Sequence, residues 1–201
     1  MRRISLALFV TLITITTVKA QPTFRAGVHT GVDIASWRIA GASGGPLKDK
    51  TDLTAGLSVE AKVSSTFSVQ LEANYSQQGT GLMNADATTV QSYNLDYVTI
   101  PLLAKLHATK NLSFYGGPQI GILLSARVVS SSAPNQDAKE LLETTDYYAV
   151  LGTQYRFDNG VFVDARYHKG TQGLIKAATD GNAKNQYVSF RIGYSFDFGK
   201  K

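Results

Sequence analysis

The stretch YVSFRIGYSFDF, residues 187–198, decides the fold of this chain. Its apolar and polar residues alternate: Val188, Phe190, Ile192, Tyr194, Phe196 and Phe198 against Tyr187, Ser189, Arg191, Gly193, Ser195 and Asp197. Neighbouring side chains of a β-strand point to opposite faces, whereas the apolar face of a helix recurs every three or four residues. The segment is therefore predicted to be a strand with one apolar and one polar face.

The same alternation predicts seven more strands upstream. They cover approximately residues 24–34, 53–63, 66–78, 91–108, 112–128, 146–157 and 161–170. Pro101 cannot donate a backbone hydrogen bond, so a bulge or a local break is expected there. The segment QDAKELLE, residues 136–143, is predicted to form one or two helical turns outside the sheet.

The connections between these strands alternate strictly in length. Residues 64–65, 109–111 and 158–160 are short links, whereas 35–52, 79–90, 129–145 and 171–185 are long. Transmembrane barrels have brief periplasmic turns and longer outside loops. The predicted fold is therefore all-β, an eight-stranded antiparallel up-and-down transmembrane β-barrel in the outer membrane of a Gram-negative bacterium, with both termini in the periplasm.

A soluble barrel of the lipocalin type would show the same alternation with the faces inverted, its apolar side chains lining a ligand cavity. Loop asymmetry, strand length and aromatic residues near strand ends favour lipid outside. Those aromatic residues are Phe24, Tyr75, Tyr93, Tyr155, Phe157, Tyr167, Phe196 and Phe198.

The first twenty residues have the features of a secretory signal. Arg2 and Arg3 precede an apolar run from Ile4 to Val18, and Ala20 is a small residue at the expected cut. The predicted division is a signal peptide over 1–20 and an outer-membrane β-barrel domain over 21–201. The signal would remove three basic residues and no acidic one, so the mature domain is close to neutral and nucleic acid is not an expected partner. The chain contains no cysteine, which excludes disulfides and cysteine-ligated zinc.

The polar face of the strands carries many charges, which are predicted to line the lumen. This group consists of Arg25, Asp33, Glu60, Lys62, Glu72, Lys105, Arg127, Arg156, Asp164, Arg166, Arg191 and Asp197. Eight strands enclose an interior that side chains can fill, so a general porin is not expected. Unpaired charges in so narrow a space would be costly, and opposite charges are expected to pair there in a structural role.

Residues 94–126 read NLDYVTIPLLAKLHATKNLSFYGGPQIGILLSA. The distinctive positions are Leu95, Asp96, Tyr97, Ile100, Pro101, Leu102, Lys105, Gly117, Pro118, Gln119 and Gly121. This pattern resembles the outer-membrane β-barrel domain family typified by the PorT proteins of Bacteroidetes. The resemblance implies a barrel in contact with outer-membrane lipid, and a role in transport or secretion that belongs to a few members of that family.

Three histidines, His29, His107 and His168, lie on the predicted lumen face. His29 with Asp33, or His168 with Asp164, could supply a general base and an orienting acid. No GxSxG-type nucleophile motif accompanies them, and their spacing does not form a metal-ligand cluster. The sequence therefore predicts no catalytic residue, no cofactor and no metal site.

The leading functional hypothesis is a non-enzymatic, monomeric barrel with a structural, binding or assembly role, whose outside loops form the interaction surface. One alternative is a narrow porin-like channel for small solutes. Another is an outer-membrane lipid-modifying enzyme or protease, for which substitution of His29 or His168 would abolish turnover.

Overall fold

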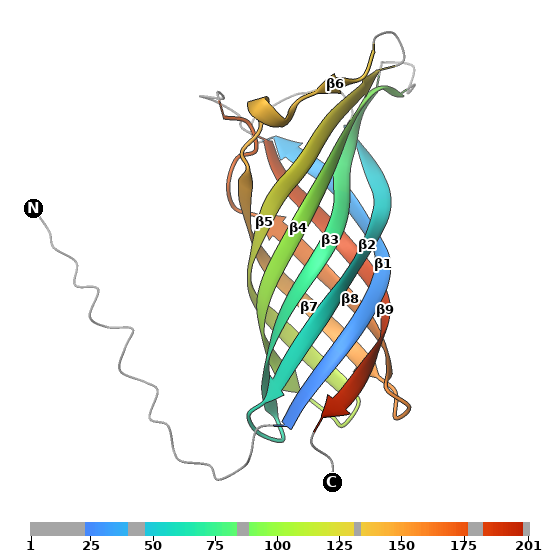
Figure 1. Cartoon of the computed structure of the whole chain (residues 1–201), viewed down its shortest axis with the longest axis vertical. Coiled ribbons are helices and arrows are strands. Elements are labelled where there is room, and N and C mark those ends of the chain that lie inside the picture. The colour runs from blue at the N-terminus through green and yellow to red at the C-terminus, as the bar shows by residue number, and fades with distance from the viewer. Residues whose placement is uncertain (1–22, 40–46, 84–88, 131–133, 177–182, 199–201) are drawn as a thin grey trace, which may run out of the picture.

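The computed structural model describes residues 23–39, 47–83, 89–130, 134–176 and 183–198. These residues form a single barrel of long, tilted antiparallel strands (Figure 1). The expected signal peptide, residues 1–20, lies outside the described residues.

Eight long strands make the barrel wall. They are β1 (Thr23–Ile39), β2 (Leu47–Lys62), β3 (Phe67–Met83), β4 (Thr89–His107), β5 (Leu112–Ser130), β7 (Thr145–Arg156), β8 (Val161–Gly170) and β9 (Ala183–Phe198). Each pairs antiparallel with the wall strand that follows it, and β9 pairs with β1 from Phe24↔Phe198 to Ile39↔Ala183. Closure leaves no open sheet edge in the wall. A membrane-spanning sheet must be closed in this way, because lipid tails cannot form hydrogen bonds with unpaired backbone groups. The predicted eight-stranded up-and-down barrel is confirmed.

Two small elements lie between β5 and β7. Strand β6 (Gln136–Asp137) pairs with the end of β5, and η1 (Lys139–Leu141) is a short 3-10 helix. The helical prediction for 136–143 is thus correct only for this one turn. Within the described ranges, no helix is long and apolar enough to cross a membrane.

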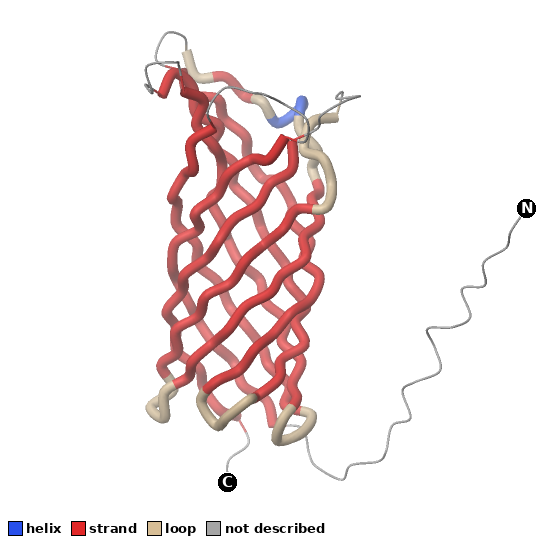
Figure 2. Tube along the Cα trace, turned by 180° about the vertical axis from the view of Figure 1, so that it is seen from behind, coloured by secondary structure: helices blue, strands red, loops and turns tan. Residues whose placement is uncertain are grey.

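The two ends of the barrel differ (Figure 2). At one end, called the turn end, residues 63–66, 108–111 and 157–160 make short connections, and the described chain begins and finishes there. Gly160 has a φ of 92°, which suits its place in the last of these tight turns. The opposite end, called the loop end, carries β6, η1 and the described residues 171–176 that follow β8.

The strands are longer than predicted at the loop end. Strand β1 continues to residue 39 rather than 34, and β2 begins at 47 rather than 53. Polar side chains such as Arg38 and Lys48 stand on these extensions. Backbone hydrogen bonding between neighbouring strands continues past the apolar band. The hydropathy pattern does not predict these extensions, because the apolar and polar alternation ends with the band.

The outward face of the wall is apolar. Exposed side chains on it include Val28, Leu57, Leu71, Leu102, Leu106, Ile120, Leu151, Val163, Phe190 and Ile192. The predicted aromatic residues also face outward, apart from Tyr93, which lies against Trp37 with ring centroids 4.8 Å apart. An apolar surface of this extent is unfavourable in water and suits hydrocarbon.

The irregularity expected at Pro101 is a local break without a bulge. Pairing between β4 and β3 stops after Leu71↔Leu102 and resumes at Asn74↔Thr99, with the same register on both sides. The irregularity between β4 and β5 lies elsewhere: Asp96 faces Ser125 and Tyr97 faces Leu123, so Leu124 is an extra residue in β5.

Candidate functional site

The middle of the lumen holds a cluster of four charges. Arg166 donates to both oxygens of Glu72, at 2.8 and 3.2 Å, and to both oxygens of Asp164, at 2.8 and 3.1 Å. Arg191 lies 3.3 Å from Glu72, and Tyr115 donates to Asp164. These four charged side chains are at most 2% exposed and balance one another. The forked contacts of Arg166 satisfy its buried charge and fix the two carboxylates in place, whereas Nε and Nη2 of Arg191 are buried without a hydrogen-bond partner among the described residues.

A second cluster lies nearer the turn end, around Lys105. Its ammonium donates to Glu60 at 3.0 Å, to Gln70 at 2.8 Å and to Gln154. Lys105 is 1% exposed, so all three of its donor hydrogens find partners inside the protein. Glu60 also accepts from Arg25 at 3.2 Å, which links this cluster to the mouth of the barrel.

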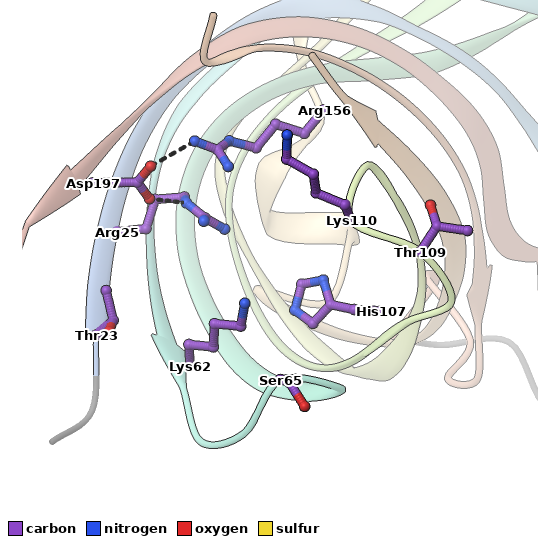
Figure 3. A pocket seen from close by; sticks show the side chains of 9 residues that line it. All are labelled: Thr23, Arg25, Lys62, Ser65, His107, Thr109, Lys110, Arg156 and Asp197. Atoms are coloured by element: carbon purple, nitrogen blue, oxygen red, sulfur yellow. Dashed lines mark hydrogen bonds and ion pairs between the residues drawn. The ribbon is translucent and has the colours of Figure 1, made fainter. Parts of the chain in front are cut away.

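The mouth at the turn end is a cavity of about 370 Å³, here called the vestibule. It is lined by Thr23, Arg25, Lys62, Ser65, His107, Thr109, Lys110, Arg156 and Asp197 (Figure 3). Asp197 accepts from Arg25 at 2.6 Å and from Arg156 at 2.7 Å, so one carboxylate bridges two guanidinium groups. Asp197 is the only acidic side chain among these nine residues, whereas four are lysine or arginine, so the lining is mainly basic.

A layer of polar residues, most of them uncharged, lies on the loop-end side of the central charges. His168 stacks on Tyr187 with ring centroids 3.9 Å apart, and its Nδ1 lies 3.0 Å from the side-chain oxygen of Gln119. Ser189 lies 3.1 Å from Nε2 of His168 and donates to Asp33 at 2.6 Å. Serine, histidine and aspartate thus meet, but the serine is in the middle and donates its hydrogen bond to the aspartate. A catalytic triad needs the histidine between the other two.

The base-and-acid pairs considered from the sequence do not form. His29 contacts Asn74 at 2.9 Å and Arg191 at 3.4 Å, and His168 has the partners given above. His107 lies 2.9 Å from Ser68 and 3.4 Å from Glu60. In the described part of the chain, no group of three or more His, Cys, Asp or Glu side chains could hold a metal ion.

The loop end of the lumen is closed by an apolar cap. Wall strands contribute Trp37, Leu95, Tyr97, Leu123, Ala126 and Ala183, and the connecting segments contribute Ala138, Leu142 and Leu174. Backbone hydrogen bonds hold these segments over the opening: Ala138 to Ala126 at 3.0 Å, and Leu174 to Ala183 at 2.8 Å. Leu142 and Ile175 form an antiparallel bridge between the two segments. The cap buries apolar surface where an open bore would hold water.

Arg127 corrects the predicted lumen set, because it is exposed on the outside of β5. Before Leu124 the odd-numbered residues of β5 point inward, as Leu123 does. Beyond this bulge the even-numbered ones do, as the buried Ala126 shows. One inserted residue reverses the alternation for the rest of the strand. Arg127 instead borders an outer hollow together with Tyr75, Gln77 and Asp96.

The structure gathers the other members of the predicted set into the two clusters, the vestibule and the polar layer. Lys62, which lines the vestibule, makes no ion pair with a described residue, whereas its neighbours there are paired. Strand alternation places Gln70 and Gln154 on the polar face, but it does not show that they bind Lys105. The cap was not predicted, because it depends on segments without periodicity.

Comparison with protein families and solved structures agrees with this architecture. The family model described as "Outer membrane protein beta-barrel domain" matches residues 19–178. Ail, the attachment invasion locus protein of Yersinia pestis, is similar in structure at 14% identity and a TM-score of 0.51. The alignment covers 86% of this chain and 98% of Ail. Neisserial surface protein A is similar at 12% identity and a TM-score of 0.57, with 85% and 97% covered.

No curated protein matches the chain in sequence. The family match spans most of the chain, and the structural likeness, at this level of identity, speaks to the fold alone. Together with the closed wall, its apolar outer face and its charged interior, the match settles the class of protein. The chain belongs to the outer membrane protein beta-barrel domain family and is a transmembrane barrel of the outer membrane.

Proposed function

We propose that this protein is a non-enzymatic, non-conducting barrel that serves as a structural or binding component of the outer membrane. The observation that carries the proposal is the filled lumen. Charges pair across its middle, and the apolar cap closes the loop end. An ion entering from either side would have to separate buried ion pairs or cross apolar packing, and both cost several kcal/mol or more.

Single-channel recording in planar bilayers tests this proposal against the narrow-channel alternative. The purified barrel is reconstituted beside a general porin as a positive control, and insertion is checked by protease protection. We expect a conductance equal to that of the bare bilayer. Resolved current steps that scale with the number of inserted barrels would overturn the proposal.

Within the described ranges, the Ser189–His168 pair that would support the enzymatic alternative is inaccessible. Ser189 and His168 are both 0% exposed, and they lie between the cap and the central charges. A lipid or peptide substrate would have to enter the packed lumen to reach them. A Ser189→Ala variant that lost turnover of lipid A or of a peptide would contradict the proposal.

The loop end is the proposed interaction surface. Leu141 of η1 is 68% exposed on the cap, and the Lys139 ammonium donates to the Leu124 carbonyl at 2.8 Å, which ties η1 to the wall. Barrels of this class place their long loops outside the cell. In that orientation Leu141, held by the cap, would be exposed to the outside of the cell.

Cysteine labelling on intact cells tests this orientation, and the absence of native cysteines makes each label specific. We expect Leu141→Cys to react with a membrane-impermeant maleimide and the matched turn-end variant Thr109→Cys to react only after lysis. The reverse pattern would refute the orientation and, with it, the proposed surface.

We further propose that the protein is exported with cleavage after residue 20. We also propose that it is related to the PorT-type barrels of Bacteroidetes. Support comes from the basic and apolar N-terminal segment and from the pattern of residues 94–126. The intact mass of the protein from outer-membrane fractions tests the cleavage. A mass that includes the first twenty residues would refute it.

A further inference from the structure

We propose that the vestibule at the turn end binds a small dianion of the phosphate type from the surrounding aqueous phase. None of the roles considered above uses this cavity. It holds about 370 Å³, enough for a phosphate group and several waters, and opens at the end of the barrel rather than toward lipid (Figure 3).

The charges around the vestibule do not balance among the described residues. Four permanent cations, Arg25, Lys62, Lys110 and Arg156, line the vestibule against one carboxylate, Asp197. Their ion pairs beyond the lining add Glu60, which also pairs with Lys105, and Asp158, so the group holds five cations and three carboxylates. Glu60 and Asp197 are each shared between two cations. The central cluster, by contrast, is neutral. An excess of two positive charges at a partly enclosed mouth attracts counter-charge, and a dianion would neutralise it.

Lys62 is the cation that we expect to bind the dianion most directly. It stands at the end of β2, is half-buried and has no ion-pair partner among the described residues. Its side chain points into the same opening as His107 and Arg156 (Figure 3). Arg25 and Arg156 are held by Asp197 at 2.6 and 2.7 Å, so their guanidinium groups are oriented before any ligand arrives. Preorganised donors lose little freedom on binding.

Hydroxyl groups complete a suitable donor set. Thr23, Ser65 and Thr109 line the vestibule beside the basic side chains. Guanidinium, ammonium and hydroxyl donors together match the oxygens of a phosphate monoester or of inorganic phosphate. A phospholipid diester carries a single charge and lies outside the wall, so the excess of two charges favours a soluble dianion.

Nuclear magnetic resonance of the isotope-labelled barrel in phosphatidylcholine nanodiscs tests the proposal. Inorganic phosphate and sulfate are titrated at pH 7.5 against chloride of equal ionic strength. We expect saturable shifts of the Ser65 and Thr109 amides with both dianions and only small linear shifts with chloride. Shifts that follow ionic strength alone, without saturation, would overturn the proposal.

Two variants of one strand make the matched comparison. Lys62→Gln removes the unpartnered cation at the turn end of β2, and Lys48→Gln removes a lysine from the loop end of the same strand. We expect Lys62→Gln to weaken phosphate binding about tenfold and Lys48→Gln to leave it unchanged. Equal affinity of Lys62→Gln and the native barrel would overturn the site.

Nanodiscs that contain phosphatidylglycerol distinguish the two phosphate sources. A soluble ligand predicts the same phosphate affinity in these discs as in neutral ones. If anionic lipid shifts the same amides and abolishes the phosphate response, the ligand is the lipid headgroup and the assignment to a soluble dianion is wrong.

Discussion

Arg166 of β8 and Glu72 of β3 form a two-bonded ion pair across the lumen, at 2.8 and 3.2 Å, between strands that are not neighbours in the wall. They lie 94 residues apart in the chain. Because the pair joins distant parts of the wall and is almost fully buried, the stability of the barrel depends on both members.

Glu72→Ala is expected to destabilise the barrel by about 3–5 kcal/mol, because Arg191 would lose its ion-pair partner and Arg166 would keep only Asp164. Urea unfolding in lipid vesicles measures the loss. The exposed Glu140→Ala is the control, with an expected change within about 0.5 kcal/mol.

The paired replacement sharpens this test. Glu72→Leu with Arg166→Met removes both charges and leaves Asp164 opposite Arg191. We expect it to cost less than the two single changes added together, because no uncompensated charge remains. Strict additivity would mean that the two side chains do not interact.

Lys105→Met should lower the free energy of unfolding by about 3 kcal/mol or more, since Glu60, Gln70 and Gln154 would lose their shared donor inside the lumen. Lys110→Met is the comparison, five positions further along the chain in the turn between β4 and β5. Its pair with Asp158 is exposed, so we expect a change below about 1 kcal/mol in the same assay. Similar losses in both variants would contradict the proposed burial of Lys105.

The turn at residues 157–160 should respond to acid. Hydrogen bonds from Lys110 and Asn111 hold the pKa of Asp158 below its ordinary value. The folded state therefore gains stability from ionised Asp158 above the unfolded pKa and loses it as the pH falls through the lower folded pKa.

A carboxyl titration followed by nuclear magnetic resonance checks this direction. We expect the pKa of Asp158 to rise toward its ordinary value in Lys110→Gln. A native pKa at or above the ordinary value would show that the pair between the two turns does not persist in solution.

The outward position of Arg127 can be measured with single cysteines. In the barrel reconstituted in nanodiscs, Arg127→Cys should react readily with a water-soluble maleimide, whereas Ala126→Cys, buried under the cap, should be protected. Protection of position 127 with reactivity at 126 would mean that β5 lacks the bulge at Leu124.

The sequence by itself determined the strands, their number and, up to the bulge in β5, which face a side chain takes, because alternation is a local property of extended backbone. It also determined that the lumen is charged. The extent of the strands at the loop end was underestimated, since backbone pairing continues where polar residues such as Lys48 remove the hydropathy contrast.

Only the tertiary structure decided which charges meet. Glu72 could pair with any inward cation until ring closure and register brought Arg166 and Arg191 to it. One extra residue at Leu124 turned Arg127 outward, and segments without periodicity supplied the cap. Alternation specifies a face, but the height of a side chain in the lumen and its partner across it depend on how all eight strands are staggered.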